Sequence, residues 1–332
     1  MMMVVVASSA FAAETMRIAI GAEVKAARLA ATTLSLGEDD EAAVFSAVRR
    51  EVTVSAQGGA LFIDGNPVGR RAVRFRTEGA IDVNGTRVRG DVVALAGRQG
   101  VQLVNVLALE DYLAGVLGSE MPKSFPLEAL KAQAIAARTY ALHKKLEQYG
   151  QPFHLGSSVI SQVYGGLASE DPRTREAVDA TRGMVLTWQL QPVEAYFHAS
   201  CGGKTESGVE ALGRDLPYLR PVTCPCSKLP QSEWKLDLGA KVQVLSRSAT
   251  GRATKVQLDG RTLDAVTFRE RIGYSKLKSL WFEVKGSRVE GHGFGHGAGM
   301  CQWGAKLLAE QGMSFREILS HYYAGTELQT LY

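Results

Sequence analysis

The fold is most constrained by a change of pattern near residue 109. Before it, short apolar runs such as Ala60–Ile63 and Val92–Leu95 alternate with turn signals at 64–67, 84–85 and 97–100. Such alternation is typical of antiparallel strands joined by hairpins. Beyond it, apolar residues recur at helical spacing and mix with further short strands. We therefore expect an α+β fold: a β-rich N-terminal part with antiparallel strands, then mixed helices and strands forming a cleft.

Start and stop signals place the later elements. Ser124 is suited to cap a long helix with Pro126 in its first turn, and Gly150 to end it near Tyr149. A capping box at Ser314 predicts a last helix to about Tyr322. The remaining expected elements are a strand at 101–106, helices at 109–117, 172–182 and 298–310, and strands at 184–188, 193–197 and 255–258.

The N-terminus indicates export. Met1–Ala13 is almost wholly apolar or small and ends in the small-x-small form of a signal-peptidase site, although a basic segment before it is missing. The alternative is a buried first strand. No later run approaches the ~20 apolar residues of a membrane span. The expected domains are a signal peptide over 1–13, a β-rich region over 14–105 and a core over 106–332.

Charge restricts the partners. The formal net charge is only +4, and no run of basic residues occurs. This mild excess is compatible with an acidic polymer but too weak to indicate nucleic acid binding.

All four cysteines lie beyond residue 200, and two of them form a C-x-C pair. In an exported protein an even number of cysteines allows disulfides. A C-x-C pair is too tight to bridge to itself comfortably but suits two ligands of one ion. A structural zinc site is the alternative, with His198 as a possible replacement ligand. The cysteines concerned are Cys201, Cys224, Cys226 and Cys301.

Glu120 is the first candidate for a catalytic residue. It lies where an apolar segment gives way to a proline-marked turn. Partial burial raises a carboxyl pKa and can make the group a proton donor near neutral pH. Lys131 and Arg138, seven residues apart on the next helix, share one face and could hold a polar or anionic substrate.

Polar clusters between regular elements are the other candidates. Glycine-rich loops let the backbone approach a ligand closely. The segment 291–299 does not follow a nucleotide-binding pattern in a βαβ context, and its glycines disfavour a helical metal pair. We expect a substrate-contacting loop there, with a structural crossover as the alternative. The predicted binding side chains are Ser161, Gln162, Tyr164, Ser200, Thr205, His296 and Gln302.

Five segments in order resemble the SpoIID/LytB family. They are E-D-Y-L-A-G-V-L-G-S-E-M-P at 110–122, E-A-L-K-A-Q-A-I-A-A-R-T-Y-A-L at 128–142, S-Q-V-Y-G-G at 161–166, H-A-S-C-G-G-K-T-E at 198–206 and G-H-G-A-G-M-C-Q-W-G-A at 295–305. The resemblance covers roughly residue 70 to the C-terminus. Where some relatives have serine in the last segment, this chain has Cys301, which favours the four cysteines meeting in space.

The resemblance implies a peptidoglycan-acting protein in the periplasm or another extracytoplasmic cell-wall space. SpoIID-type members are lytic transglycosylases that cut peptide-free glycan strands and leave 1,6-anhydro-N-acetylmuramic ends. Their catalytic glutamate maps onto Glu120, and a lysine and an arginine implicated in activity map onto Lys131 and Arg138. LytB-type relatives are amidase enhancers, so a non-catalytic partner of a cell-wall amidase is the alternative; a glycoside hydrolase is a third reading. The chemistry requires no cofactor.

Overall fold

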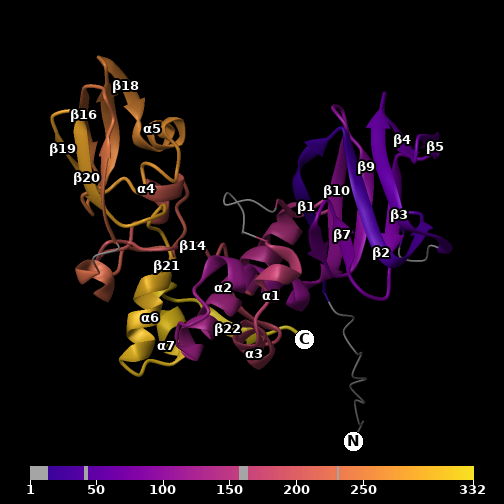
Figure 1. Ribbon diagram of the computed structural model, residues 1–332. Coiled ribbons are helices and arrows are strands. Elements are labelled where there is room, and N and C mark those ends of the chain that lie inside the picture. Colours follow the sequence, from indigo (N-terminus) through magenta and orange to yellow (C-terminus); the bar gives the residue numbers. More distant parts are fainter. Residues whose placement is uncertain (1–13, 41–43, 157–163, 230–231) are drawn as a thin grey trace, which may run out of the picture. The chain divides into compact units, whose positions relative to one another are not determined.

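The computed structural model describes residues 14–40, 44–156, 164–229 and 232–332. The chain forms two compact units (Figure 1). Unit 1 consists of residues 1–120, 141–183 and 332, and unit 2 of residues 121–140 and 184–331. The chain therefore passes from one unit to the other at Glu120, and helix α2 (Leu127–Glu147) contributes to both.

Unit 1 is built on one large sheet, drawn in indigo and purple in Figure 1. Its strand order is β11-β1-β10-β9-β6-β2-β3-β4-β5, with the β7–β8 hairpin joined to β2. Only the β1–β11 pair is parallel among the strand pairs of the described part of this sheet. The strands are β1 (Thr15–Val24), β2 (Ala26–Gly37), β3 (Ser46–Gln57), β4 (Ala60–Ile63), β5 (Asn66–Pro67), β6 (Ala72–Arg76), β7 (Ile81–Val83), β8 (Thr86–Val88), β9 (Asp91–Ala96), β10 (Val101–Ala108) and β11 (Leu155–Gly156).

The predicted hairpins are confirmed. Asn84 and Gly85 join β7 to β8 with φ values of 52° and 91°, the left-handed conformation that a two-residue hairpin turn requires. The turn between β4 and β5 has the same character at residues 64 and 65. Alternate strand residues such as Leu29, Phe75 and Val92 are fully buried in one apolar cluster. The β-rich N-terminal part of the predicted α+β fold is thus confirmed.

The helices of unit 1 follow the sheet directly. Helix α1 (Leu109–Glu120) begins where β10 ends, and most of its residues up to Leu117 are buried. Helix α3 (Pro172–Ala180) is capped by Asp171, whose side chain accepts a hydrogen bond from the Arg173 amide, while Thr174 completes a capping box. A short 3₁₀ turn, η1 (Gly166–Ser169), precedes α3. Both α1 and α3 lie where the sequence pattern predicted helices.

Unit 2 combines short strands and short helices. The strands are β12 (Met184–Trp188), β13 (Gln191–Pro192), β14 (Phe197–His198), β15 (Glu233–Asp237), β16 (Val242–Arg247), β17 (Ala253–Leu258), β18 (Arg261–Asp264), β19 (Phe282–Lys285), β20 (Arg288–His292), β21 (Met300–Cys301) and β22 (Glu327–Thr330). The helices are α4 (Gly208–Leu212), η2 (Pro225–Lys228), α5 (Ala265–Ile272), α6 (Gln302–Glu310) and α7 (Phe315–Tyr322). Ser314 and Glu317 form the predicted capping box of α7.

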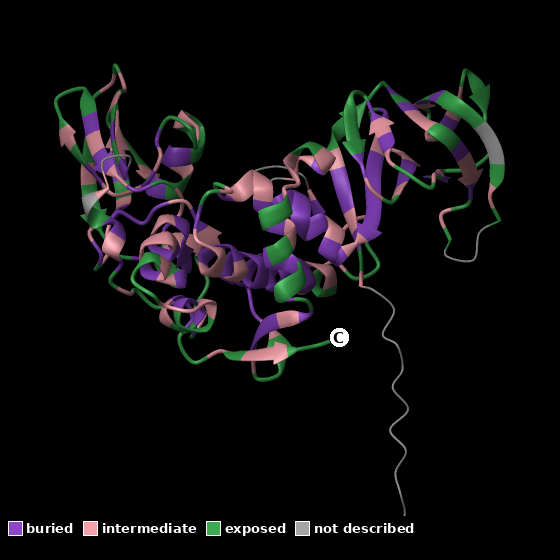
Figure 2. Cartoon of the chain, turned by 60° about the horizontal axis from the view of Figure 1, so that its bottom comes forward, coloured by how far each residue is buried: buried purple, intermediate pink, exposed green. Residues whose placement is uncertain are grey.

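Residues 233–292 form a β module with a core of its own. Two three-stranded sheets, β15-β20-β19 and β16-β17-β18, pack with α5 around Phe268, Phe282 and Val256. Figure 2 shows buried positions (purple) alternating with exposed ones (green) along such strands. Of this module, the sequence pattern predicted only the strand at 255–258.

Three local predictions are corrected. Residues 193–196 are not a strand, since their amides form tight turns such as Ala195 N–H to Val193 O; only Phe197 enters a strand. Residues 298–301 are not helical, because Gly299 has a φ of 69° and Met300–Cys301 pairs with Phe197–His198. Ser124 does not cap α2, whose first turn forms on the Pro126 carbonyl instead.

The predicted signal peptide at 1–13 lies outside the described residues. Among the helices that are described, none has the length and apolar character needed to cross a membrane.

Candidate active site

Glu120 is the last residue of α1 and is half-buried. The helix places it there because residues 109–117 form an almost continuous buried surface that ends one turn earlier. Glu120 is thus a partly buried residue, and its predicted catalytic role stays a prediction.

The C-terminal half of α1 is held by the 164–169 segment of unit 1. Ser119 Oγ donates to Ser169 Oγ at 2.8 Å and lies 3.0 Å from the Gly115 carbonyl oxygen. A Cβ atom at Gly115 would lie 2.9 Å from the Tyr164 ring, and one at Gly165 would overlap Ser169 Oγ. Glycine is required at both positions for this close approach. The segment containing Glu120 and the Y-G-G segment are thus packed together.

Tyr164 stabilises this packing through its contacts with the sheet and with α1. Its hydroxyl donates to Asn105 Oδ1 at 2.9 Å, and Asn105 in turn donates to the carbonyl groups of Arg89 and Asp91. Its ring lies 5.3 Å from that of Tyr112 in α1. Burial raises the pKa of the Tyr164 phenol well above its ordinary value. The observed contacts of Tyr164 therefore join α1 to the sheet, while its predicted contact with substrate stays a prediction.

Two carboxyl groups near α1 have cationic partners. Asp111 pairs with Arg175 at 3.0 Å, and Glu170 receives both Arg89 and Arg175. Burial alone would raise the pKa of Glu170, but hydrogen bonds and charges from Arg89 and Arg175 outweigh it, so its pKa is lowered. The lowered pKa makes Glu170 a poor proton donor near neutral pH.

The two predicted cations of α2 occupy different environments. Arg138 is fully buried, and its Nη1 donates to the Met184 carbonyl oxygen at 3.1 Å. Lys131 is half-buried, pairs with Glu128 at 2.8 Å and lies over the Phe315 ring. Arg138 thereby ties α2 to β12 in unit 2. Its predicted contact with substrate, like that of Lys131, stays a prediction.

Two of the glycine-rich segments pair with each other in unit 2. Strand β14 runs parallel to β21, so that His198 lies opposite Cys301. Ser200 forms two backbone hydrogen bonds with Phe294, and Glu206 donates its amide hydrogen to Gly297. A Cβ atom at Gly299 would lie 2.0 Å from the Tyr196 carbonyl oxygen, so no larger residue fits this crossing.

Most predicted polar side chains of these segments point into the protein. The Thr205 hydroxyl accepts from the Val222 amide, and the Gln302 amide group donates to buried Gln133. The Ser200 hydroxyl points to Cys226 at 3.8 Å. His296 bonds the Phe197 carbonyl oxygen and the Ala298 amide; burial, with the nearby charge of Arg269, lowers its pKa to about 4. These groups build the loops, and their predicted contacts with substrate are untested. Ser161 and Gln162 lie outside the described residues.

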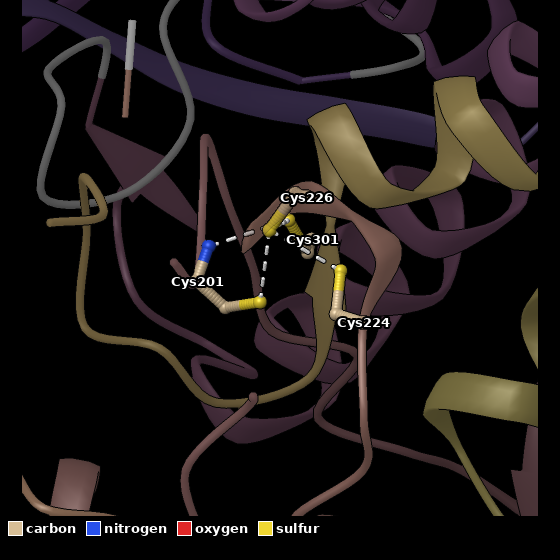
Figure 3. A group of neighbouring side chains, drawn as sticks. All are labelled: Cys201, Cys224, Cys226 and Cys301. Atoms are coloured by element: carbon tan, nitrogen blue, oxygen red, sulfur yellow. Dashed lines mark hydrogen bonds between the residues drawn. The ribbon is translucent and has the colours of Figure 1, made fainter. Parts of the chain in front are cut away.

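The four cysteines converge. Their sulfur atoms all lie within 4.8 Å of one another and all four residues are buried (Figure 3). From Cys226 the sulfur atoms of Cys201, Cys224 and Cys301 are 3.3, 3.4 and 3.7 Å away. Hydrogen bonds from the neighbouring thiols lower the pKa of Cys226. The expectation that the four would meet in space is confirmed.

Several residues of this region were not predicted. Glu206 is a buried carboxylate that accepts from Ser248 and Thr250, and buried Arg252 lies 3.9 Å from it. These bonds attach the β module to the 198–206 segment. Trp303 packs edge-on against Phe125, with ring centroids 4.9 Å apart. Glu206 and Trp303 each had a sequence signal, since they belong to the segments at 198–206 and 295–305.

A surface pocket of about 540 Å³ in unit 1 is separate from these segments. Its wall includes Arg17, Arg74 and Arg76 but no residue of the five segments. Asp39 pairs with Arg17 and Arg74, and Asp91 with Arg76. Because these arginines are paired, the pocket offers little net charge to a ligand.

Comparison with known proteins identifies the family. Residues 97–188, which hold α1, α2 and the Y-G-G segment, match the family described as SpoIID, stage II sporulation protein. Stage II sporulation protein D of Bacillus subtilis is 33% identical over 70% of this chain and 77% of its own length. The chain belongs to the SpoIID family.

Two further relatives extend the comparison. Stage II sporulation protein D of Bacillus amyloliquefaciens is 31% identical over 68% of this chain and 75% of that protein. The amidase enhancer of Bacillus subtilis is 29% identical over 65% of this chain and 40% of its own length. The proteins similar to this chain therefore include both stage II sporulation proteins D and an amidase enhancer.

Proposed function

We propose that this SpoIID family member is a peptidoglycan lytic transglycosylase with Glu120 as its general acid and base. The observation that carries the proposal is the position of Glu120. It is a half-buried carboxyl group at the end of a buried helix, held in place by a second family segment. Membership of the SpoIID family supports the proposed substrate class.

The proposed reaction needs one carboxyl group. Glu120 gives its proton to the glycosidic oxygen as the bond from that oxygen to C1 of the muramic sugar breaks. The C6 hydroxyl of the same sugar then bonds to C1 and gives its proton to the Glu120 carboxylate, which restores the acid. No water is consumed, and the product carries a 1,6-anhydro ring. The C6 hydroxyl acts at a high effective concentration because it belongs to the reacting sugar.

The ion pairs of Glu170 favour this reaction over hydrolysis. A glycoside hydrolase ordinarily uses two carboxyl groups roughly 5–9.5 Å apart. Glu170 follows Ser169, which bonds to Ser119, and it is held in ion pairs with two arginines, which suits neither a proton donor nor a free nucleophile. Positioned acid–base catalysis by a single group contributes about 10²–10⁴-fold.

The predicted binding residues then divide into two roles. Arg138, Thr205 and Gln302 are buried and act as positioning residues, through Met184, Val222 and Gln133 respectively. For Lys131, which is half-buried, we propose a contact with a hydroxyl or carboxylate group of the glycan. We further propose that the protein acts outside the cytoplasm, in the cell-wall space, on glycan strands freed of their peptides.

Product analysis tests this proposal. Purified protein is incubated with intact sacculi and with sacculi treated by an amidase, and the released fragments are weighed by mass spectrometry. We expect fragments with anhydro ends, released faster from the peptide-free strands. Fragments with reducing ends would indicate a hydrolase instead.

A second candidate function is stimulation of a cell-wall amidase. The similarity to an amidase enhancer favours it, as does the inward orientation of several predicted binding side chains. It predicts that the protein leaves glycan strands uncut yet raises the turnover of an added amidase. The same sacculi, assayed for released peptide, distinguish the two functions.

A further inference from the structure

We propose that Cys201, Cys224, Cys226 and Cys301 bind one zinc ion in a closed, structural site. All four cysteines are free thiols among the described residues, are buried, and direct their sulfur atoms to one point (Figure 3). The site is independent of the proposed catalytic chemistry and of Glu120.

The spacing of the sulfur atoms fits a tetrahedral ion. Zinc lies about 2.3 Å from each thiolate sulfur, so the sulfur atoms of a regular tetrahedron lie about 3.8 Å apart. The three distances from Cys226 are 3.3, 3.4 and 3.7 Å, and no pair exceeds 4.8 Å. Small shifts of these side chains are enough to reach the ideal geometry. Tetrahedral sulfur ligation favours zinc or iron among common metals.

The surroundings supply hydrogen-bond donors to the sulfur atoms. The amides of Cys201 and Gly304 both donate to Cys301 Sγ at 3.3 Å. The hydroxyl of Tyr322 lies 3.2 Å from Cys224 Sγ, and that of Ser200 donates to Cys226 Sγ at 3.8 Å. Donors aimed at ligand atoms are typical of protein metal sites, where they stabilise negatively charged ligands.

A buried cation beside the four cysteines also favours a negatively charged zinc–thiolate site. Four thiolates with one zinc ion carry a net charge of −2, which is costly to bury without a cation. Arg252 is 5% exposed, and one of its nitrogen atoms donates to the carbonyl oxygens of Cys201 and Lys204, both at 2.8 Å. Its guanidinium group is therefore fixed beside the loop that carries a ligand, where its positive charge is shared between the Glu206 carboxylate, 3.9 Å away, and the cysteine sulfur atoms.

The ligands come from three separate stretches of chain. Cys201 lies in the 198–206 segment, Cys224 and Cys226 lie at η2, and Cys301 caps α6. A zinc ion would cross-link these stretches at the point where β14 and β21 pair. With four protein ligands and no exposed position, it would hold the loops together and leave no place for a substrate.

His198 is not needed in this ligand set. Its Nδ1 bonds the Ala298 carbonyl oxygen at 3.1 Å, and the group of converging ligand atoms consists of the four sulfur atoms. The alternative of three cysteines with His198 therefore makes a different prediction, namely that metal is lost when His198 is replaced.

The test is the metal content of the full-length protein, expressed with zinc and purified without chelator. We expect about one zinc per chain by plasma mass spectrometry and four thiols that react only after denaturation with chelator. Cobalt in place of zinc should give the intense absorption of a tetrahedral thiolate site. Removal of the metal should lower the melting temperature by roughly 10 °C or more.

Variants sharpen the result. Cys226→Ser should lose the metal, whereas His198→Gln should keep it. Gly304→Ala is a variant that keeps all four ligands. Its Cβ would lie 2.3 Å from Cys224 Sγ and 2.1 Å from the Tyr322 hydroxyl, so metal affinity should fall at least tenfold.

Two disulfides in the native protein, bound iron, or four reactive thiols without metal would each overturn the proposal. Loss of metal in His198→Gln would overturn the four-cysteine ligand set. Activity with or without zinc bears only on the proposed function.

Discussion

Replacement of Gly115 by alanine tests how α1 positions Glu120. The new Cβ atom would lie 2.9 Å from the Tyr164 ring and 3.2 Å from the Gly166 carbonyl oxygen. The ring cannot turn away easily, because its hydroxyl is bonded to Asn105 and its face packs near Tyr112. The helix or the 164–166 segment must therefore shift.

Two opposing terms set the size of the effect. Overpacking of a close contact costs about 1–3 kcal/mol. Alanine favours the helix over glycine by about 1 kcal/mol. We expect a net loss of about 0–2 kcal/mol in the free energy of unfolding, or a melting temperature lower by up to roughly 8 °C. Because Gly115 lies only about 7.5 Å along the helix from Glu120, the shift should also misplace the carboxyl group.

Thermal unfolding and the rate of glycan cleavage are the two assays. Misplacement of a catalytic group by about 1 Å can cost on the order of 10²-fold in rate. We expect kcat to fall more than KM rises, and Tyr164→Leu to relieve part of the loss of stability in the double variant. If Gly115→Ala is about 1 kcal/mol more stable than wild type and fully active, the close packing inferred here is wrong.

Two further predictions concern pH and aromatic packing. Burial, with the charges of Lys145 and Arg17, lowers the pKa of His154 to about 4 in the folded protein. Between about pH 6.5 and pH 4 the unfolded chain therefore binds more protons than the folded protein does. Stability measured by urea unfolding should therefore fall as pH falls through this window, and less so in His154→Gln; an equal fall in both proteins would contradict this. Phe125→Ala and Trp303→Ala should show a coupling of about 0.5–1.5 kcal/mol in a double-mutant cycle, because the rings meet edge-on; additive effects would exclude the contact.

Local patterns in the sequence predicted much of the fold. The strand at Met184–Trp188 was placed correctly because it is a short apolar run bounded by Gly183 and a turn. Asn84–Gly85 specified its hairpin because both residues tolerate positive φ. Signals of this kind act within a few residues, so the sequence alone is enough to identify them.

Elements set by distant contacts were not predictable in this way. Met300–Cys301 has a helix-like sequence context, yet it pairs with Phe197–His198, about a hundred residues earlier. The β module at 233–292 gave almost no signal, because its strands are short and its core forms only when two sheets meet. Arg138 was predicted as a substrate-holding cation but is fully buried and donates to the Met184 carbonyl group. Burial of such a group depends on a distant hydrogen-bond partner, which a local sequence pattern cannot identify.

The proposed function is tested most directly by the replacement of Glu120 with glutamine. The variant keeps the size of the side chain and removes its titratable proton. On peptide-free glycan strands we expect the release of anhydro-ended fragments to fall by about 10²–10⁴-fold, with the melting temperature unchanged within about 2 °C. Release of those fragments at the wild-type rate by a well-folded Glu120→Gln protein would contradict the assignment of Glu120 as the catalytic acid.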